Sequence, residues 1–474
     1  MSFEQFVGRA VPLARLGSLF EQVRETESGL LLTVRGRRQV GKSRLISEFC
    51  ERSGAPYLYF TGRRGADTGR QLDAVSQSAS DARTPLQGAD ALTSPARSWA
   101  VAFRQLAVAV GKTPSIVVLD EFPWAAEADP ALEAELQVAW DDTLGRSPVM
   151  VVLVGSDVTV MERLTGRDRP LYGRGLELVV GPFNPAEVAS AAGIPPVDAL
   201  DTYLVTGGYP RLVSACRKTT AERFVRDQLS DDASPLIITG QRALDAEFPP
   251  QAQARAVLSA IGSDQRSFAA ITNSLGGEVA SGPLTRSLRL LTDTKGVVAG
   301  ELPAGAAPSS KLRRYRVADS YLRFWLRFIE PQLDNISRGR ADLATKSFTD
   351  GWLSWRGRAI EPVVHEALYR LAPDDPVLQR LSSVGAWWTR TGTEVDIVAT
   401  ASKGAAILAV GSIKWRARHA FDRSDLAELT QARTVIPNAA TADLIAVSAV
   451  EPAVSVRSEL ARVYLPDHLM TAWT

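Results

Sequence analysis

Cysteine, histidine and lysine are scarce in this chain of 474 residues. It has two cysteines, three histidines and, among 54 basic residues, eight lysines. Two thiols cannot form a disulfide framework or a four-thiolate zinc site, and so few histidines offer little in their place. The composition therefore excludes a disulfide-stabilised secreted protein, and we expect no structural metal and a reducing, cytoplasmic compartment.

Excess charge and long apolar runs are missing as well. Basic residues number 54 and acidic residues 53, so the net charge of +1 creates no overall basic field for nucleic acid or lipid. No apolar run approaches the roughly 18 residues of a membrane span, and the first residues lack a secretory signal pattern. The composition, 45% hydrophobic and 23% charged, is globular, and the length predicts about three domains. Any nucleic-acid binding must be local.

A strand, a loop and a helix are predicted in turn over residues 29–49. The loop fits the pattern G-x-x-x-x-G-K-[ST] in this context, with Gly36, Gly41, Lys42 and Ser43 at its fixed positions. In such a loop, backbone N–H groups surround phosphates, Lys42 reaches the β- and γ-phosphates, and Ser43 ligates magnesium. We add Arg44, in the first turn of the helix, to the nucleotide-binding set. The alternative is a glycine-rich turn before an ordinary helix.

A second apolar strand is predicted before two carboxylates. Residues 116–119 are all apolar, and Asp120 and Glu121 follow. Parallel sheets bind nucleotides at the carboxyl ends of their strands, so these acids belong beside the phosphates. We expect Asp120 to hold magnesium through water and Glu121 to polarise the attacking water. The alternative is an acidic helix cap after a core strand.

Two further polar residues are candidates for sensing or neutralising phosphate. Ser156 ends the apolar strand predicted over residues 149–156, and Arg174 follows a Pro-Leu-Tyr-Gly turn. Arg174 could neutralise charge on the transferred phosphate in its own subunit or in a neighbour. Serine is common at strand ends, and one arginine among many is a weak signal.

Five segments together resemble the archaeal-type ATPases of the STAND branch of AAA-related P-loop proteins: FVGR at 6–9, GRRQVGKSRL, LDEFPW, PLYGR and TGGYPR at 206–211. The resemblance implies that Gly8, Arg9, Gly208 and Pro210 lie near the adenine. It also implies that Arg211 occupies the place of a second sensor. A tight turn between two lid helices is the alternative for the glycines near Pro210.

Residues 251–330 show the pattern of a winged helix, with three short helices followed by two strands around a Pro/Gly/Ala/Ser tip. Basic residues gather on its third helix and its last strand: Arg286, Arg289, Lys311, Arg313, Arg314 and Arg316. Such a cluster can neutralise DNA phosphates while the third helix enters the major groove. A protein-binding module or a rigid lid is the alternative. The aromatic run at 321–328 predicts a buried helix between domains rather than a base-stacking surface.

The segment YRVADSYLRFWLRF resembles the one that, in a branch of this ATPase family, precedes a restriction-endonuclease-like domain. A PD-(D/E)XK nuclease needs two acids for magnesium and a lysine for water. Glu361, Asp396 and Lys414 fit parts of that pattern, but Ser412 stands where the second acid is expected. A hydroxyl is a poor substitute for a carboxylate on magnesium. Glu394 could be a migrated ligand, yet we expect a degenerate domain kept for binding or packing.

The sequence thus predicts an α/β multidomain chain. We expect a P-loop ATPase core at 1–185, a helical lid at 186–250, a winged helix at 251–330 and a nuclease-like domain at 331–474. Residues 61–97 should form a mobile excursion. The predicted function is a magnesium-dependent ATPase that acts as a nucleotide-driven switch. An ATP-regulated nuclease or DNA-binding maintenance or defence protein is the alternative, and an oligomer or protein partner stays open.

Overall fold

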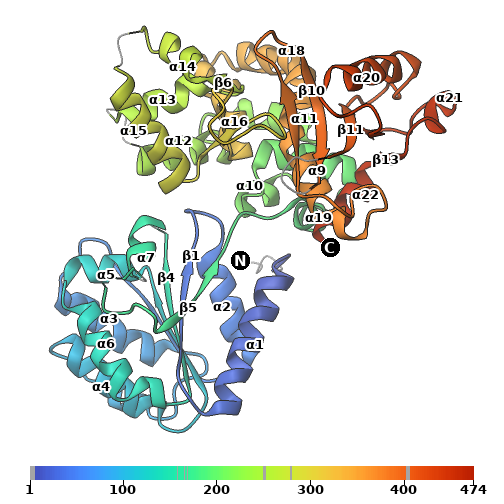
Figure 1. Ribbon diagram of the computed structural model, residues 1–474. Helices are drawn as coiled ribbons and strands as arrows, with labels where there is room; N and C mark the ends of the chain where they lie inside the picture. The colour runs from blue at the N-terminus through green and yellow to red at the C-terminus, as the bar shows by residue number, and fades with distance from the viewer. Residues whose placement is uncertain are drawn as a thin grey trace. The chain divides into compact units, whose positions relative to one another are not determined.

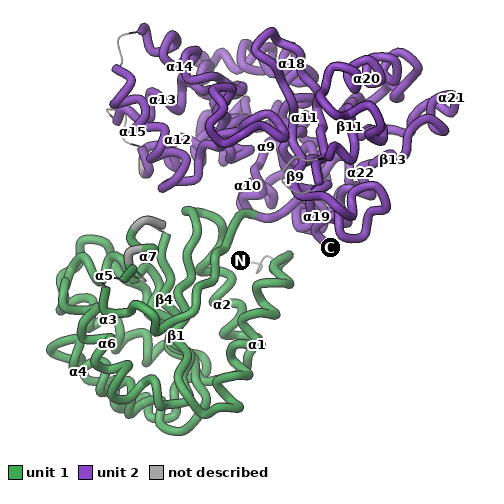
Figure 2. Tube along the Cα trace, viewed as in Figure 1, with its two compact units in different colours: residues 1–182 green, residues 183–474 purple. Residues whose placement is uncertain are grey.

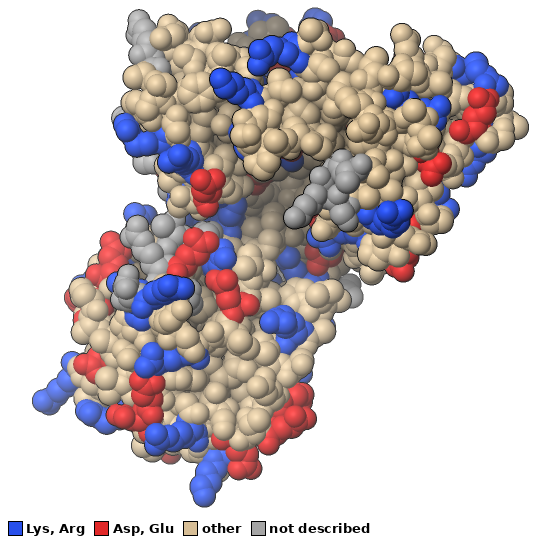
Figure 3. Space-filling view, viewed as in Figure 1, with Lys and Arg blue, Asp and Glu red and all other residues tan. Residues whose placement is uncertain are grey.

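The chain folds into two compact units, residues 1–182 and 183–474, in a computed structural model (Figure 2). The structure describes residues 6–156, 158–164, 166–167, 169–248, 252–277, 280–401 and 406–474. Lysine and arginine are interspersed with aspartate and glutamate on the face drawn in Figure 3. That distribution agrees with the near-zero net charge.

The first unit is built on a parallel sheet of five strands in the order β2-β3-β4-β1-β5. Its strands are β1 (Leu30–Arg35), β2 (Tyr57–Thr61), β3 (Ser115–Asp120), β4 (Val149–Gly155) and β5 (Gly175–Val179). β3 and β4 are buried along their whole length, as expected for central strands covered on both faces. Because all strands are parallel, their carboxyl ends meet at one edge.

Helices cover both faces of this sheet (Figure 1). They are α1 (Ala10–Thr26) and α2 (Lys42–Ser53) on one face, and α3 (Thr68–Asp81), α4 (Trp99–Val110), α5 (Phe122–Ala128) and α6 (Leu132–Asp142) on the other, with α7 (Val158–Leu164) after β4. Phe20 and Phe49 pack edge to face, which joins α1 to α2. The sequence predicted a strand before the phosphate loop, a second one before the acids Asp120 and Glu121, and a third one leading to Ser156. All three strands are confirmed as β1, β3 and β4.

The prediction of a mobile excursion at residues 61–97 is wrong. Most of its first half is α3, whose Leu72, Ala74 and Val75 are buried in the core of the unit. Gln71 is fully buried, and its side-chain amide donates to the carbonyl of Arg63 and accepts from the N–H of the same residue. The Gly, Ala and Ser content suggested a loop, but an apolar stripe at helical spacing decided the structure.

The second unit begins with five helices: α8 (Pro185–Ala192), α9 (Pro196–Thr206), α10 (Pro210–Ala215), α11 (Ala221–Leu229) and α12 (Pro235–Glu247). They pack against α16 (Ser320–Phe328), in which seven of nine residues are buried. The hydroxyl of Tyr321 and the indole of Trp325 donate to carbonyls of α12, at 2.6 and 3.1 Å. The predicted buried helix between domains is confirmed.

Between α12 and α16 lie the helices and strands that the sequence assigned to a winged helix. They are α13 (Gln253–Ile261), β6 (Arg266–Ser267), α14 (Phe268–Ser274), α15 (Ser281–Arg289), β7 (Val298–Glu301) and β8 (Arg314–Val317). The strands form an antiparallel sheet in the order β6-β8-β7. The wing is the segment 302–313, between β7 and β8. This arrangement of three helices and a hairpin is the one that the sequence predicts.

The last part of the chain contains a mixed sheet in the order β13-β12-β11-β10-β9. Its elements are β9 (Ser383–Trp388), β10 (Glu394–Thr400), β11 (Ile407–Lys414), β12 (Asp443–Ser448) and β13 (Arg462–Tyr464), with α20 (Arg423–Val435), α21 (Val454–Arg457) and α22 (Pro466–Met470). Three helices lead into it from α16, namely α17 (Leu333–Ser337), α18 (Ala341–Ala359) and α19 (Glu361–Leu371). The prediction of an α/β multidomain chain is confirmed. Within the described ranges, no helix is long and apolar enough to cross a membrane.

Candidate functional site

The loop between β1 and α2 has the backbone of a phosphate-binding turn. Gly41 caps α2 with a φ of 88°, and Gln39 also has a positive φ, of 65°. A Cβ on Gly36 would lie 2.1 Å from the carbonyl oxygen of Val180, so only glycine fits there. Left-handed residues just before a helix point successive N–H groups toward one anion site. The signature glycines are therefore required by the local backbone.

Lys42 is buried in this loop. Its ammonium donates to the carbonyls of Gly36 and Arg37, at 2.8 and 2.9 Å. Desolvation lowers the pKa of Lys42 to about 8, against the opposing effect of Glu121 and Asp120. An anionic phosphate would compensate this desolvation, because it would supply the counter-charge that the two backbone carbonyls lack.

Asp120 ends β3 at the carboxyl edge of the sheet and is also buried. Its carboxylate accepts from the hydroxyl of Tyr59, at 2.9 Å, and from the N–H of Glu121, at 2.9 Å. The Tyr59 hydroxyl also lies 3.2 Å from the carbonyl of Ser43, the first-turn residue of α2. Burial raises the pKa of Tyr59, so this phenol stays protonated as a donor. Tyr59 thus ties Asp120 to the phosphate loop, a role that sequence reasoning missed.

Glu121 has a left-handed backbone, with φ 48° and ψ 41°, between β3 and α5. Such a conformation is costly for a residue other than glycine and is found mostly at functional sites. Ser156, at the end of β4, donates its hydroxyl to both carboxylate oxygens of Glu121, at 3.1 Å each. In the sheet, β4 lies between β1 and β3, so Ser156 lies between the phosphate loop and the acids.

Arg9 lies against the phosphate loop. Its guanidinium donates to the carbonyls of Val40 and Gly181, both at 2.7 Å, and the side chain is buried. Gly8 and Arg9 both have positive φ, of 74° and 63°, which makes a sharp turn before α1. Within the first unit, the structure therefore brings together the loop, Arg9, Asp120, Glu121 and Ser156.

Gly208, Pro210 and Arg211 belong to the second unit. Gly208 lies in the turn between α9 and α10, where a Cβ on it would meet the carbonyl oxygen of Phe183 at 2.0 Å, and Pro210 and Arg211 begin α10. A tight turn between lid helices, the alternative that the sequence allowed, describes this geometry. Their proximity to adenine stays a prediction. Arg44 is exposed and lies 3.7 Å from Glu48 of its own helix.

Arg174 does not reach the phosphate loop of its own subunit, so that part of the prediction is wrong. It precedes Gly175, which pairs with Leu31 near the start of β1, whereas the loop follows Arg35. Four residues of strand place it roughly 13 Å away along the sheet, at the amino edge. There its guanidinium forms two 2.8 Å bonds with Asp141. A role in a neighbouring subunit stays a prediction.

The basic residues of the winged helix divide into two groups. Arg286 and Arg289 are exposed on α15. Arg316 instead pairs with Glu301 at 2.6 Å, and Arg314 pairs with Glu394 at 3.0 Å and stacks over Trp388. The expectation that all of them face DNA is therefore corrected for these two, because the chain itself neutralises them.

The wing packs on the edge strand β9. The N–H of Ala304 donates to the carbonyl of Ala386 at 2.9 Å, and the indole of Trp388 donates to the carbonyl of Leu312 at 3.0 Å. Arg313 donates to Gly300 of the neighbouring strand at 3.1 Å. The wing therefore covers an edge that would otherwise expose unpaired backbone groups.

The nuclease-like residues are near one another but are engaged differently from a metal site. Asp396 accepts from the Ser412 hydroxyl at 3.0 Å and from the N–H of Ile413 at 2.7 Å. Lys414 forms ion pairs with Asp425 and Glu428 of α20, at 3.2 and 3.3 Å. The lysine is thus paired with helix acids rather than with Asp396.

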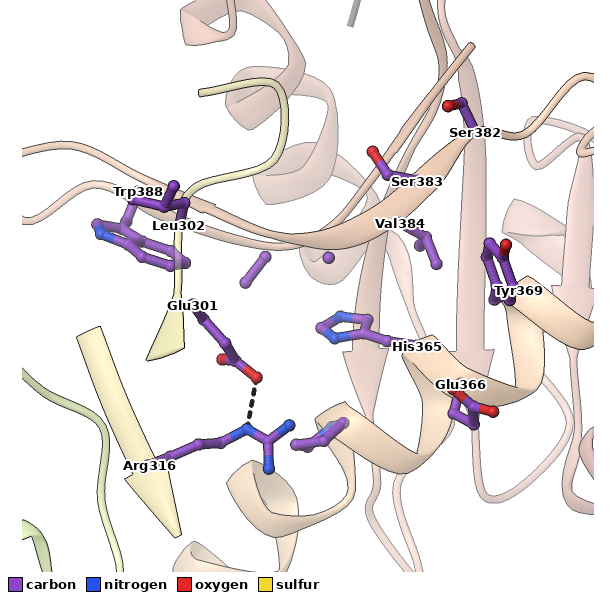
Figure 4. Close-up of a pocket in the computed structure, with 13 residues that line it drawn as sticks. Glu301, Leu302, Arg316, His365, Glu366, Tyr369, Ser382, Ser383, Val384 and Trp388 are labelled. Carbon is purple, nitrogen blue, oxygen red and sulfur yellow. Dashed lines mark hydrogen bonds and ion pairs between the residues drawn. The ribbon is translucent and has the colours of Figure 1, made fainter. Parts of the chain in front are cut away.

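Glu361 begins α19, and desolvation raises its pKa to about 8, with a further contribution from Asp396. Beside it, a cavity of about 460 Å³ separates α19 and β9 from the hairpin of the winged helix. Figure 4 shows the Glu301–Arg316 pair on one wall and His365 and Tyr369 on another. Across the parts of the chain that are described, no three His, Cys, Asp or Glu residues are grouped to hold a metal ion.

Two family models match separate parts of the chain. Residues 5–152 match the family model described as an AAA ATPase domain. Residues 325–426 match the model described as archaeal and bacterial proteins of unknown function, DUF234. The chain therefore carries an AAA-type ATP hydrolase domain, which confirms the predicted P-loop ATPase, followed by a DUF234 domain.

One relative and two solved structures are similar to this chain. An uncharacterized protein of Methanocaldococcus jannaschii is 22% identical over 390 residues, 81% of this chain and 82% of that protein. A Walker-type ATPase of Pyrococcus abyssi is 21% identical and covers 68% of this chain and 96% of its own, with a TM-score of 0.49. The ORC2 protein of Aeropyrum pernix, in ADPNP and ADP complexes, is 15% identical over 72% and 98%, with a TM-score of 0.45.

Proposed function

We propose that the first unit binds ATP with magnesium and hydrolyses it at the carboxyl edge of its sheet. The single observation that carries this proposal is the convergence of Lys42, Asp120, Glu121 and Ser156 from three neighbouring strand ends. Each of these side chains is held by a hydrogen-bonding partner of the chain itself. Preorganised charge of this kind is the main source of catalysis in phosphoryl transfer.

Each residue has a defined chemical role in this proposal. The N–H groups of the loop and the ammonium of Lys42 bind the phosphates. The carboxylate of Glu121 orients the attacking water and accepts its proton. Ser156 binds both oxygens of Glu121 and therefore competes with that water. Exchange of this hydrogen bond for one to the γ-phosphate would free the carboxylate only when ATP is present.

The residues present fit a magnesium ion. The Ser43 side chain is exposed at the start of α2, and Tyr59 fixes one oxygen of Asp120 beside it. Hydroxyl, carboxylate and water oxygens are the ligands that magnesium prefers. When bound, the ion would neutralise phosphate charge. Ser43 would hold it directly, and Asp120 would hold it through water.

We further propose that nucleotide occupancy acts on the second unit as a switch. Asp201 of α9 accepts from Arg356 of α18 at 2.6 Å and from the indole of Trp415, after β11, at 3.0 Å. This buried cluster joins the lid helices to the DUF234 domain. A movement of the lid helices would therefore also move the DUF234 domain.

Steady-state hydrolysis of ATP by the full chain tests the proposal. We expect magnesium-dependent turnover that Asp120→Ala abolishes and Lys42→Ala reduces together with nucleotide affinity. Arg174→Ala is the matched control. Because Arg174 lies at the amino edge of the sheet, away from the phosphate loop of its own subunit, we expect its loss to leave nucleotide affinity unchanged. Unchanged affinity and turnover in both Asp120→Ala and Lys42→Ala would refute the proposed site.

A second candidate function is DNA association through α15. The exposed Arg286 and Arg289 favour it, since they lie on the helix that would enter the groove. If duplex DNA belongs to the working cycle, it should stimulate hydrolysis, and the stimulation should fade as salt rises. A slow rate that is indifferent to DNA, with nucleotide retained through purification, would favour a switch controlled by another macromolecule.

A further inference from the structure

A second large cavity lies where the winged helix meets the DUF234 domain. Its volume is about 1000 Å³, and it is open to solvent between β6, the start of α14, the end of the wing, β8 and the turn after β9. All of these segments belong to the second unit. We call this cavity the basic groove and define it by its five cationic residues: Arg266, Lys311, Arg313, Arg314 and Arg390.

The charge of the basic groove is one-sided. Among the described residues that line it, none is acidic, although the whole chain has almost equal numbers of acids and bases. Glu394 lies just outside the lining and pairs with Arg314, which leaves four cations in excess. Such a concentration of one sign in a concavity raises the local concentration of anions.

The cationic side chains of the groove differ in exposure. Lys311 and Arg390 are exposed. Arg266 is half-buried, and one of its terminal nitrogens donates to the Ser274 hydroxyl at 2.9 Å. Lys311 and Arg390 are therefore the two charges of the groove most open to an anionic ligand.

The size and the aromatic content narrow the class of ligand. The volume lies at the upper end of small-molecule sites, so it suits a segment of a polymer better than one anion, yet it is too small to enclose a duplex. Phe268 and Tyr315, both partly exposed, also line it. Basic side chains that follow a backbone, with aromatic rings beside them, are the usual composition of sites for single strands.

From this we infer that the basic groove binds single-stranded nucleic acid, with Arg266, Lys311, Arg313 and Arg390 on the phosphates. The site is distinct from the α15 surface, which faces duplex in the second candidate function. It does not depend on the proposed ATPase chemistry. It gives the wing a further role, because the wing's packing on β9 forms one side of the groove.

The test is fluorescence anisotropy of a labelled single-stranded oligonucleotide, in DNA and RNA forms, with the full chain over a salt series. The variant is Lys311→Ala with Arg390→Ala, two exposed side chains whose loss should leave folding intact. For single strands, each phosphate contact adds about 0.7 to the steepness with which log affinity falls as log salt concentration rises. We therefore expect weaker binding and a slope smaller by about 1.4 in the variant.

Two matched controls separate this site from general charge. Arg340→Ala with Arg370→Ala removes the same charge from exposed positions at the start of α18 and in α19, and should leave binding unchanged. Arg286→Ala with Arg289→Ala tests the α15 surface. ATP turnover without oligonucleotide should be the same in all three double variants as in the unaltered protein. A loss of oligonucleotide binding can then be told apart from a failure of the ATPase proposal.

Several outcomes would overturn the inference. These are no binding of single strands by the unaltered protein, equal loss in the Arg340/Arg370 control, or loss only in the Arg286/Arg289 variant. Complete displacement of the oligonucleotide by inorganic phosphate at constant ionic strength would also overturn it, because it would identify a site for a single anion. A preference for duplex over single strand of equal length would do the same.

Discussion

The ATPase core and the DUF234 domain both place acids and a lysine at the ends of neighbouring segments, but they use them differently. In the first unit, Lys42 donates to two backbone carbonyls, and Asp120 accepts hydrogen bonds from neutral donors. In the DUF234 domain, Lys414 is paired with two carboxylates of α20. The first arrangement leaves charges to be satisfied by a ligand, and the second has satisfied them already.

This difference shows that residue type alone does not make a site. A carboxylate and a lysine become catalytic when the fold leaves their charge uncompensated and directed at one place. Asp396 has the Ser412 hydroxyl and a backbone N–H as partners, while Lys414, two residues after Ser412, forms ion pairs with Asp425 and Glu428. The predictions below test this contrast, from the largest expected effect to the smallest.

Glu121→Gln should cause the largest change. The amide keeps the size of the side chain and can still bind Ser156, but it cannot accept a proton from water. We expect turnover to fall by about 10²- to 10⁴-fold with nucleotide affinity retained. Turnover and nucleotide affinity are measured on the same preparation, and Glu127→Gln in α5 is the control. Turnover within a few-fold of the unaltered protein would remove Glu121 from the mechanism.

Asp201→Ala should cost about 3–5 kcal/mol of the free energy of unfolding of the second unit. It would leave the buried Arg356 uncompensated and the Trp415 indole without its acceptor. Urea unfolding followed by tryptophan fluorescence measures the effect. Asp342→Ala removes an exposed ion pair, of 2.8 Å with Arg340, and should change stability little. Similar results for the two variants would mean that the buried cluster does not hold the lid to the DUF234 domain.

Nucleotide affinity should decrease above pH 8. The pKa of Lys42 is lowered to about 8, so its positive charge is present below that pH and is lost as pH rises through it. If only the charged form binds phosphate, affinity should fall about tenfold between pH 7 and pH 9. Binding should also take up protons above pH 8. Glu121→Gln removes a negative charge that raises the pKa of Lys42, so it should move the fall in affinity to lower pH. A flat profile in the unaltered protein would mean that Lys42 does not carry the binding charge.

Ser412→Asp should have the smallest effect on chemistry. It restores an acid at the expected place, yet Lys414 stays paired with Asp425 and Glu428. We expect neither the unaltered chain nor this variant to nick plasmid with magnesium or manganese. Lys346→Ala, which removes an exposed lysine of α18, is the control for the loss of charge in Lys414→Ala. Nicking that Lys414→Ala abolishes would show that the DUF234 domain is an active nuclease.

Much of the fold could be predicted from the sequence because its signals are local. The apolar runs before Gly36, Asp120 and Ser156 predicted three central strands, and the basic hairpin predicted a wing. The excursion at 61–97 was misjudged because its apolar stripe is diluted by small residues. The Tyr59 contact could not be found, since a tyrosine in a strand carries no signal about which neighbouring strand its hydroxyl will meet.

The sequence by itself determined the chemistry available: a phosphate loop that only glycine can form at Gly36, acids after a buried strand, and serine in place of an acid at Ser412. Only the tertiary structure decided which of these groups are directed at a ligand. Strand order brought Ser156 to Glu121 and left Arg174 at the opposite edge. Packing of the wing on β9 neutralised Arg314 and created the basic groove. The physical reason is that strand order and packing bring together side chains far apart in the chain, and the charges that meet there determine which groups remain to bind a ligand.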